Sequence, residues 1–316
     1  GESMQEVAGG WQAVYELDTN KVELPDREVL VDNCGTGMDS YKTFNISTAA
    51  SIVAAAGGVK VARHGARAIT SVCGTVDMAE QLGVDVECDV ATVARSIQEV
   101  GLGLFNGMSP AVHPLALGRI LSQIRFGSPL NIAASLANPA LPGSGVRGVY
   151  AKEMLEPVAS VMRSIGYREG VVIYGAVDKS DKGMDEASVC GTTHVCRFEA
   201  DKVTTYTVEP EQCGLTRHKP DELEPSGDRH EEAVGMISLL GGQTEGARRD
   251  AVLLNSAFVF LVRNLCNNLQ DGVVLAGELI DSGKVLLQLE RWVECQNREP
   301  EKGLAQLAAL KQEALQ

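Results

Sequence analysis

Residues 34 to 48 combine glycines, hydroxyl side chains and a carboxylate in one short stretch, CGTGMDSYKTFNIST. The glycines at 35 and 37 allow backbone N–H groups to approach a ligand closely, because glycine has no side chain to obstruct them. Ser47 and Thr48 open an alanine-rich segment typical of a helix, and a helix N-terminus favours negative charge. The stretch therefore indicates either a turn with an N-capping hydroxyl or a seat for an anion such as a diphosphate.

Two further segments carry charged side chains. Gly183-Met184-Asp185-Glu186 places adjacent carboxylates in a predicted loop, and carboxylate oxygens are ligands that Mg²⁺ accepts. Arg63-His64-Gly65-Ala66-Arg67 follows a predicted strand, at the sheet edge where open α/β folds bind ligands. Each has an ordinary explanation, since an Asp-Glu pair is commonly a solvated surface and a single histidine is commonly structural. The rest of the sequence decides between these interpretations.

The elements that must position these residues alternate along the chain. We predict strands over 28–32, 59–62, 101–105 and 171–174, and helices over 47–56, 75–82 and 91–100. This alternation predicts an α/β fold with a mostly parallel sheet. A β-hairpin over 193–198 and 203–208 and a helical region from Glu231 onward follow.

Three segments are predicted to stand apart from the sheet as a small helical domain. They are a helix over 5–17, a segment over 109–124 that holds His113-Pro114 and an apolar helix, and a helix over 131–136. The chain begins with Gly1 and not with Met, so we expect part of the N-terminal region to be missing or disordered.

Composition excludes several classes of function. The net charge of −14 opposes binding to a polyanion, so we expect no nucleic-acid partner. No stretch approaches the roughly 20 apolar residues that span a bilayer and no signal peptide is visible, so we expect a cytoplasmic protein without a membrane partner. The eight cysteines include no CxxC pair, which predicts neither a zinc site nor a disulfide framework.

Several motifs in order make the chain resemble the anthranilate phosphoribosyltransferase family. After CGTGMDSYKTFNIST come VKVARHGARAITSVCGTVDMAEQLGV, SPAVHP, GMDEASVCGTTHV and RRDAVLLNSA. The resemblance runs from Gly1 to Asp281-Ser282-Gly283 and so covers nearly the whole chain. It implies a large α/β domain with a parallel central sheet flanked by helices, a small all-helical domain, a fold like those of nucleoside phosphorylases and phosphoribosyltransferases, and a homodimer.

The resemblance also implies the boundaries and the reaction. It places the small helical domain in 1–22 and 107–126, and the large domain, which binds 5-phosphoribosyl-1-diphosphate, in 23–106 and 127–316. The reaction is the Mg²⁺-dependent transfer of phosphoribose to an aromatic amine, with release of diphosphate. It implies no catalytic acid or base, because an aromatic amine is already neutral at pH 7 and catalysis can rest on positioning and electrostatics.

The site residues that the resemblance implies fall into three sets. The donor set comprises Gly35, Thr36, Gly37, Asp39, Thr43, Asn45, Ser47, Thr48, Arg63 and Cys73. The acceptor set comprises His64, Ala66, Met108, Pro110, His113, Arg119 and Gln123. The Mg²⁺ set comprises Ser47, Asp185 and Glu186.

Departures from the family pattern gather at the acceptor. Met38 stands where the family has a second glycine, Arg63 replaces a phosphate-binding lysine, and Val72-Cys73 replaces a Lys-Ser pair. Ala66 replaces an asparagine that faces the acceptor, and Gln123 falls where an arginine holds the carboxylate of anthranilate. The lysine that follows His-Pro in the family falls at Leu117, and Arg119 and Arg125 lie near Gln123 but out of register.

These departures leave several functions open. A pocket without the charged partner of a carboxylate binds that carboxylate poorly, which favours phosphoribosyl transfer to a different or less polar nitrogen acceptor. One alternative is transfer to anthranilate itself, with Arg119 or Arg125 turned toward its carboxylate. The others are a nucleoside phosphorylase and a binding protein of the same fold without catalysis.

Overall fold

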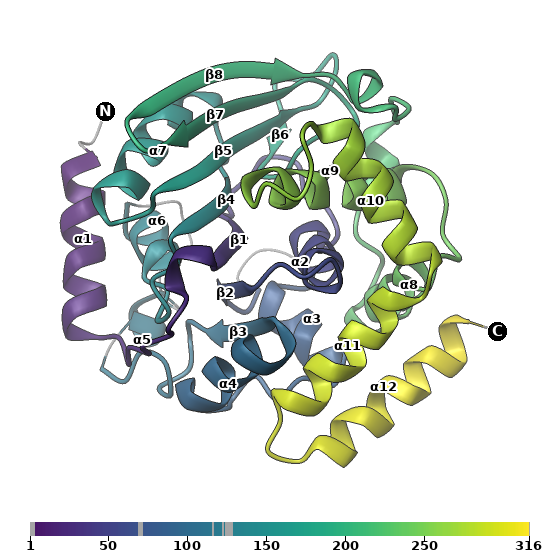
Figure 1. The fold of residues 1–316 in the computed structure, drawn as a ribbon, viewed down its shortest axis with the longest axis horizontal. Helices are drawn as coiled ribbons and strands as arrows, with labels where there is room; N and C mark the ends of the chain where they lie inside the picture. The colour runs from purple at the N-terminus through teal and green to yellow at the C-terminus, as the bar shows by residue number, and fades with distance from the viewer. Residues whose placement is uncertain (1–3, 69–71, 116, 122, 124–128, 316) are drawn as a thin grey trace.

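The computed structural model describes residues 4–68, 72–115, 117–121, 123 and 129–315. Within them an eight-stranded sheet has the order β3-β2-β1-β4-β5-β7-β8, with β6 paired to β5 (Figure 1). The strands are β1 Val31–Gly35, β2 Val61–Gly65, β3 Leu102–Asn106, β4 Ser144–Gly148, β5 Glu169–Ala176, β6 Gly183–Met184, β7 Thr193–Glu199 and β8 Lys202–Val208. β1 to β5 are parallel to one another, whereas β6 and β7 pair with β5, and β8 with β7, in the antiparallel direction. The predicted α/β class with a mostly parallel sheet is confirmed.

Helices cover both faces of this sheet. They are α1 Met4–Leu17, α2 Ile46–Ala56, α3 Thr75–Gln81, α4 Val90–Val100, α5 Leu117–Leu121, α6 Pro129–Leu136, α7 Leu155–Ser164, α8 Arg229–Leu240, α9 Ala247–Val262, α10 Leu269–Asp281, α11 Lys284–Cys295 and α12 Pro300–Ala314. Short 3₁₀ turns are η1 Arg27–Val29, η2 Lys152–Met154, η3 Pro210–Cys213 and η4 Pro220–Leu223. None of the helices in the described part of the chain is long and apolar enough to cross a membrane.

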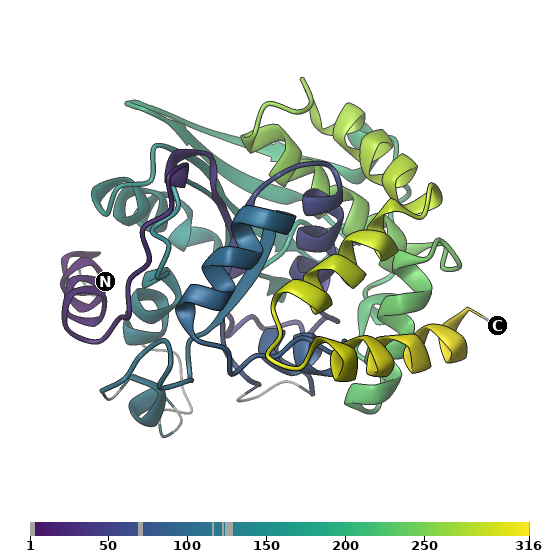
Figure 2. The same cartoon turned by 60° about the horizontal axis from the view of Figure 1, so that its bottom comes forward.

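Four clusters of buried apolar residues in the described part of the chain hold these layers together, and two of them are large. The larger joins the sheet to α2 and to helices from α8 to α12, and the second joins β5 and β7 to α1, α6 and α7. Small residues let α2 sit at the centre of the larger core, and a Cβ added at Gly57, where α2 ends, would lie 2.6 Å from Phe260. The chain termini lie on opposite sides of the molecule, beyond α1 and α12 (Figures 1 and 2).

Most predicted elements exist, but some boundaries were wrong. The helices expected over 47–56, 75–82 and 91–100 and the hairpin strands are confirmed. The strand expected over 28–32 starts only at Val31, because the turn after Pro25-Asp26 winds residues 27–29 into η1. Arg63, His64 and Gly65 belong to β2 and not to a loop. β4, with the sequence SGVRG, was not predicted, because two glycines and an arginine are poor strand signals.

The segments predicted to pack apart from the sheet are grouped around α1. The Trp11 indole N–H of α1 donates to the Leu136 carbonyl at the end of α6 (3.0 Å), and Gly10 packs against Ala133. The apolar helix expected after His113-Pro114 is α5, whereas Ile124 and Arg125 lie outside the described residues. The division into domains at 1–22 and 107–126 stays a prediction.

Candidate active site

A cavity of about 530 Å³ opens where β1 and β2 end. The stretches predicted to do chemistry meet there, since the glycine loop after β1, the segment after β2 and the Asp185-Glu186 pair all line it. The described lining residues are Cys34 to Asp39, Lys42 to Asn45, Ser47, His64 to Ala68, Cys73 to Thr75, Gly107, Met108, Leu117, Asn131, Ala134, Ser135, Asp185 and Glu186.

The glycine loop is shaped to receive the Asp185 carboxylate. Gly37 has φ +67°, and its N–H donates to Asp185 Oδ2 (2.7 Å). A Cβ at Gly35 would lie 2.1 Å from the same carboxylate oxygen, and a Cβ at Gly148 would lie 1.5 Å from the Asp185 carbonyl oxygen. Because Gly35 and Gly148 are register partners in β1 and β4, two bare positions side by side make room for this residue.

Ser40 fastens the same loop to the strand that precedes the carboxylate pair. Its hydroxyl oxygen accepts from the Gly183 N–H (2.9 Å), and the Tyr41 N–H donates to the Gly183 carbonyl (3.0 Å). The glycine loop and Asp185 therefore keep a fixed separation although they are far apart in sequence.

The carboxylates of Asp185 and Glu186 are crowded; Asp185 is half-buried and Glu186 is buried. Glu186 Oε1 accepts from the Ser47 N–H in the first turn of α2 (3.2 Å). Burial, reinforced by the charge of Asp39, raises the pKa of Asp185 to about 7. Burial and the charge of Asp185 raise the pKa of Glu186 to about 8. Two carboxyl groups that resist ionisation together are stabilised by a nearby cation.

Arg63 lies beneath the first turn of α2. Its side chain is 1% exposed and donates to the Asn33 carbonyl (3.0 Å), to Thr48 Oγ1 (2.7 Å) and to Ser47 Oγ (2.9 Å). It is absent from the described cavity wall, where Ser47 is present. Arg63 therefore acts on the site by orienting the Ser47 hydroxyl and by placing a buried positive charge behind Glu186.

His64 and His113 form a second buried link. Their Nε2 atoms are 3.0 Å apart, and His113 Nδ1 is 2.6 Å from the Asp18 carbonyl oxygen. Because a carbonyl only accepts, His113 carries its proton on Nδ1 and its Nε2 accepts from His64. Burial lowers the pKa of His113 and lowers that of His64 well below the usual value.

Few described side chains in the wall can balance an anion. The charged lining residues are Asp39, Lys42, Arg67, Asp185 and Glu186. Lys42 pairs with Asp39 (2.8 Å), and Arg67 is bound by Glu80 and Glu87. A phosphorylated ligand would therefore find both cationic side chains of the described wall already paired, and it would gain from bringing a cation of its own.

The cavity brings together most of the predicted donor and metal residues. In the donor set only Thr48 and Arg63 lie behind the wall, and the three metal residues Ser47, Asp185 and Glu186 all line it. In the acceptor set His64, Ala66 and Met108 line the wall. Pro110, Arg119 and Gln123 are exposed and His113 stands behind His64, so these four are not among the described lining residues.

Sequence reasoning missed Lys42, Asn131, Ala134 and Ser135 in this wall. Asn131 to Ser135 belong to α6, which was assigned only a packing role. The one signal available was that α6 follows the acceptor segment directly in the chain.

Mg²⁺ fits the donor set of this cavity. Within the described ranges no group of three or more His, Cys, Asp or Glu side chains is placed to enclose a metal ion. Mg²⁺ is instead held characteristically by one or two carboxylates together with waters and substrate phosphates. Asp185 and Glu186 are such a pair, with raised pKa values that a divalent cation would reverse.

Comparison with known proteins agrees with this geometry. Residues 27–286 match the family model of the glycosyl transferase family, a/b domain. The chain is 38% identical over 288 residues to an anthranilate phosphoribosyltransferase of Citrifermentans bemidjiense, covering 90% of this chain and 79% of that protein.

Two solved structures have the same fold. The anthranilate phosphoribosyltransferase of Thermus thermophilus superposes with a TM-score of 0.81 at 34% identity, covering 94% of this chain and 86% of that one. The enzyme from Saccharomyces cerevisiae, in complex with PRPP and Mg, superposes with a TM-score of 0.79 at 26% identity, covering 93% of this chain and 80% of that one. On this match to the family model, the sequence identity and the shared fold, the chain belongs to the anthranilate phosphoribosyltransferase family.

Proposed function

We propose that this protein transfers the phosphoribosyl group of 5-phosphoribosyl-1-diphosphate to a nitrogen acceptor, with Mg²⁺ as cofactor and diphosphate as leaving group. The observation that carries the proposal is the carboxylate pair Asp185 and Glu186, held by N–H groups of the glycine loop and of α2 in one cavity. The cytoplasmic location and the homodimer expected from the sequence are part of this proposal.

The residues of the chain would work by positioning and by charge. Asp185 and Glu186, with Ser47, would hold the cation, and Arg63 orients Ser47 from behind. When bound, Mg²⁺ supplies positive charge that stabilises a departing diphosphate. The glycine loop and the N-terminus of α2 lie where the diphosphate of the donor would bind. No residue needs to remove a proton before attack, because an aromatic amine already has a free lone pair at neutral pH.

We propose further that the acceptor is less polar than anthranilate. The described wall beside His64 carries the apolar residues Ala66, Met108, Leu117 and Ala134 and the uncharged polar residues Asn131 and Ser135. Gln123, at the position of the family's carboxylate-binding arginine, is exposed and does not belong to this described wall. The two cationic side chains of the described cavity wall, Lys42 and Arg67, are already paired with protein carboxylates, so an anionic acceptor finds little to balance its charge.

Diphosphate release in the presence of Mg²⁺, 5-phosphoribosyl-1-diphosphate and a panel of aromatic amines and azoles tests both proposals. We expect release with a neutral acceptor and little with anthranilate. Turnover of anthranilate at ordinary enzyme rates would overturn the altered acceptor. No release with any acceptor, combined with no Mg²⁺-dependent binding of the donor, would overturn the transferase.

One double variant distinguishes an enzyme from a binding protein without catalysis. Replacing Asp185→Ala together with Glu186→Ala should abolish diphosphate release if the protein is an enzyme. If the biological activity survives this change unaltered, the protein acts by binding alone.

A further inference from the structure

The Asp77 carboxylate binds the part of the cavity wall that follows β2, from the side that faces away from the cavity. Asp77 of α3 is 1% exposed and is not a described lining residue. Its Oδ2 atom accepts from the N–H groups of Ala68 (2.8 Å) and Gly74 (3.0 Å). A Cβ at Gly74 would lie 2.4 Å from the Ala68 nitrogen, so a glycine is needed for these two points to meet. One carboxylate therefore fastens two separate points of the wall.

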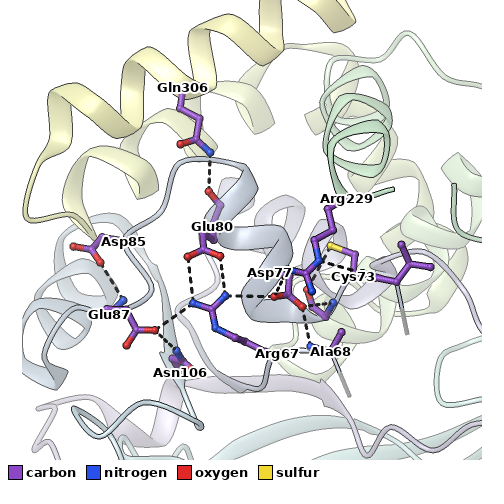
Figure 3. Close-up of polar contacts among 12 residues, drawn as sticks. Arg67, Ala68, Cys73, Asp77, Glu80, Asp85, Glu87, Asn106, Arg229 and Gln306 are labelled. Carbon is purple, nitrogen blue, oxygen red and sulfur yellow. Dashed lines mark hydrogen bonds and ion pairs between the residues drawn. The ribbon is translucent and has the colours of Figure 1, made fainter. Parts of the chain in front are cut away.

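The second oxygen of Asp77 binds two arginines. Oδ1 pairs with Arg67 (3.4 Å) and with Arg229 at the start of α8 (3.1 Å). Arg229 also donates to the Val72 carbonyl (3.3 Å). Figure 3 shows Arg67 and Arg229 approaching Asp77 from different sides. The wall is thereby attached to the helical layer that contains α8.

Arg67 extends this network toward the acceptor side. It donates to both carboxylate oxygens of Glu80 (2.7 and 3.2 Å) and to Glu87 Oε1 (3.3 Å), as Figure 3 shows. Hydrogen bonds to these carboxylates, first of all to Glu80, raise the pKa of Arg67. Its guanidinium is thus occupied by protein carboxylates, although the residue lines the cavity.

Glu87 completes the connection to the other wall. Its Oε1 accepts from Asn106 Nδ2 (3.0 Å) and its Oε2 accepts from the Ser109 hydroxyl (2.7 Å). Asn106 in turn accepts from the N–H of Met108 (3.0 Å), which lines the cavity. A continuous chain of polar contacts joins the wall that contains Cys73, a residue of the donor set, to the wall that contains Met108, a residue of the acceptor set.

We propose that Asp77, Arg67 and Glu87 are positioning residues that fix the acceptor wall against the donor wall. The inference rests on the proposed function, because it assigns these three residues to the geometry of that reaction. The rate of group transfer depends on the separation of the two reactants, and a small misplacement of either one lowers that rate strongly. The network therefore sets how well a bound acceptor is aligned with the donor.

Glu80 offers a matched control for Glu87. Both carboxylates bind Arg67, and their side chains are 46% and 45% exposed. Of the two, only Glu87 has hydrogen bonds to Asn106 and Ser109 within the described residues. Glu87→Ala and Glu80→Ala thus remove side chains of the same size and exposure and differ in the connection to the acceptor wall.

The test measures steady-state kinetics of the full chain with Mg²⁺, 5-phosphoribosyl-1-diphosphate and the best acceptor of the panel, with calorimetric binding of the donor alongside. We expect Glu87→Ala to raise the acceptor KM about tenfold and Glu80→Ala to change it less than about twofold, with donor affinity kept in both. Equal acceptor KM values in the two variants would overturn the inference while the transferase stands.

A second variant protects the test against misfolding. Ser109→Ala removes one hydroxyl that donates to Glu87 and should raise the acceptor KM in the same direction by a smaller factor. If Glu87→Ala does not fold and Ser109→Ala leaves the acceptor KM unchanged, the inference is wrong. A wild-type protein that neither binds the donor nor releases diphosphate removes the proposed function, and this inference with it.

Discussion

Met38 adopts a backbone conformation that few side chains accept. Its φ is +67°, directly after Gly37 with the same value. A non-glycine residue in this left-handed region costs about 1 kcal/mol. Because Met38 lines the cavity beside Asp39, the strain places a thioether side chain at the donor end of the site.

Two substitutions separate the bulk of Met38 from its strain. We predict that Met38→Gly and Met38→Ala both lower the KM for 5-phosphoribosyl-1-diphosphate several-fold, because both open the donor end. Only Met38→Gly relieves the backbone strain, so it should unfold at higher urea concentration than Met38→Ala. The measurements are steady-state kinetics and urea unfolding. Donor KM values equal to that of the wild type in both variants would show that the side chain does not limit donor binding.

Arg63 is a buried cation that supports the site without lining the cavity. Its planar guanidinium donates to three acceptors in fixed directions, which a lysine ammonium on a flexible stem does not reproduce. We predict that Arg63→Lys lowers the free energy of unfolding by about 1–3 kcal/mol and raises the Mg²⁺ concentration needed for half-maximal activity, because Ser47 loses its partner. Urea unfolding and an Mg²⁺ titration check this. Unchanged Mg²⁺ dependence would assign Arg63 to stability alone.

At the scale of elements, the imidazole pair joins the end of α1 to β2. The chain from the Asp18 carbonyl through His113 to His64 crosses from the helical side of the molecule to the sheet. Both histidines have lowered pKa values, chiefly through burial. The unfolded chain takes up protons near pH 6.5, whereas the folded protein resists them.

This difference predicts an acid-sensitive junction. Above about pH 6.5 the two histidines are neutral in both states and do not reduce the free energy of unfolding. That free energy falls as the pH drops toward the pKa values of the histidines in the folded protein. We predict that His113→Gln makes the loss of unfolding free energy between pH 7 and pH 5 smaller, by up to about 1.4 kcal/mol per pH unit. Urea unfolding at both pH values measures it. His230→Gln, at an exposed position, is the control. If the free energy of unfolding changes equally with pH in both variants, His113 is not a source of the acid sensitivity.

The elements also show what sequence patterns can and cannot predict. We predicted α2 and the β7–β8 hairpin because their sequences carry local signals. An alanine-rich run predicts the helix, and alternating side chains predict the two strands. β4 was missed because Arg147 is buried in it against Asp32 (2.6 Å), a pairing between residues far apart in sequence. The predicted strand ended three residues before β2 does, so Arg63 was assigned to a loop at the ligand site. In the structure it belongs to the strand, and its side chain points away from the cavity. The motif loops were found, but contacts between segments, such as Lys42 and α6 in the cavity wall, leave no local signal.

At the scale of the whole molecule, large apolar side chains near the end of α1 and around α5 face outward. Leu17, Leu115 and Ile120 are 71%, 66% and 43% exposed. Leu17 and Leu115 lie close together, because the Leu115 N–H donates to the carboxylate of Asp18 (2.5 Å). Exposed apolar clusters favour contact with a partner.

We predict that this surface contacts a second copy of the chain. Leu115→Glu should shift the protein toward monomer, because it would bury a charge in the interface, while leaving the urea midpoint of the monomer unchanged. Light scattering after size exclusion gives the mass. Val274→Glu, at a 56% exposed position on α10, is the control. A mass of one chain for the wild type, or no change on Leu115→Glu, would remove this interface.

The paired glycines at 35 and 148 bear on any attempt to evolve the enzyme in the laboratory. A Cβ at either position would overlap Asp185, so a combinatorial library that randomises them would consist almost entirely of inactive clones. Ala66 and Met108 line the acceptor side of the cavity and are half-buried, whereas Leu117 is 2% exposed and packs against Val14 of α1. A selection for new acceptors should therefore randomise the codons of Ala66 and Met108 and keep Leu117 and both glycines fixed.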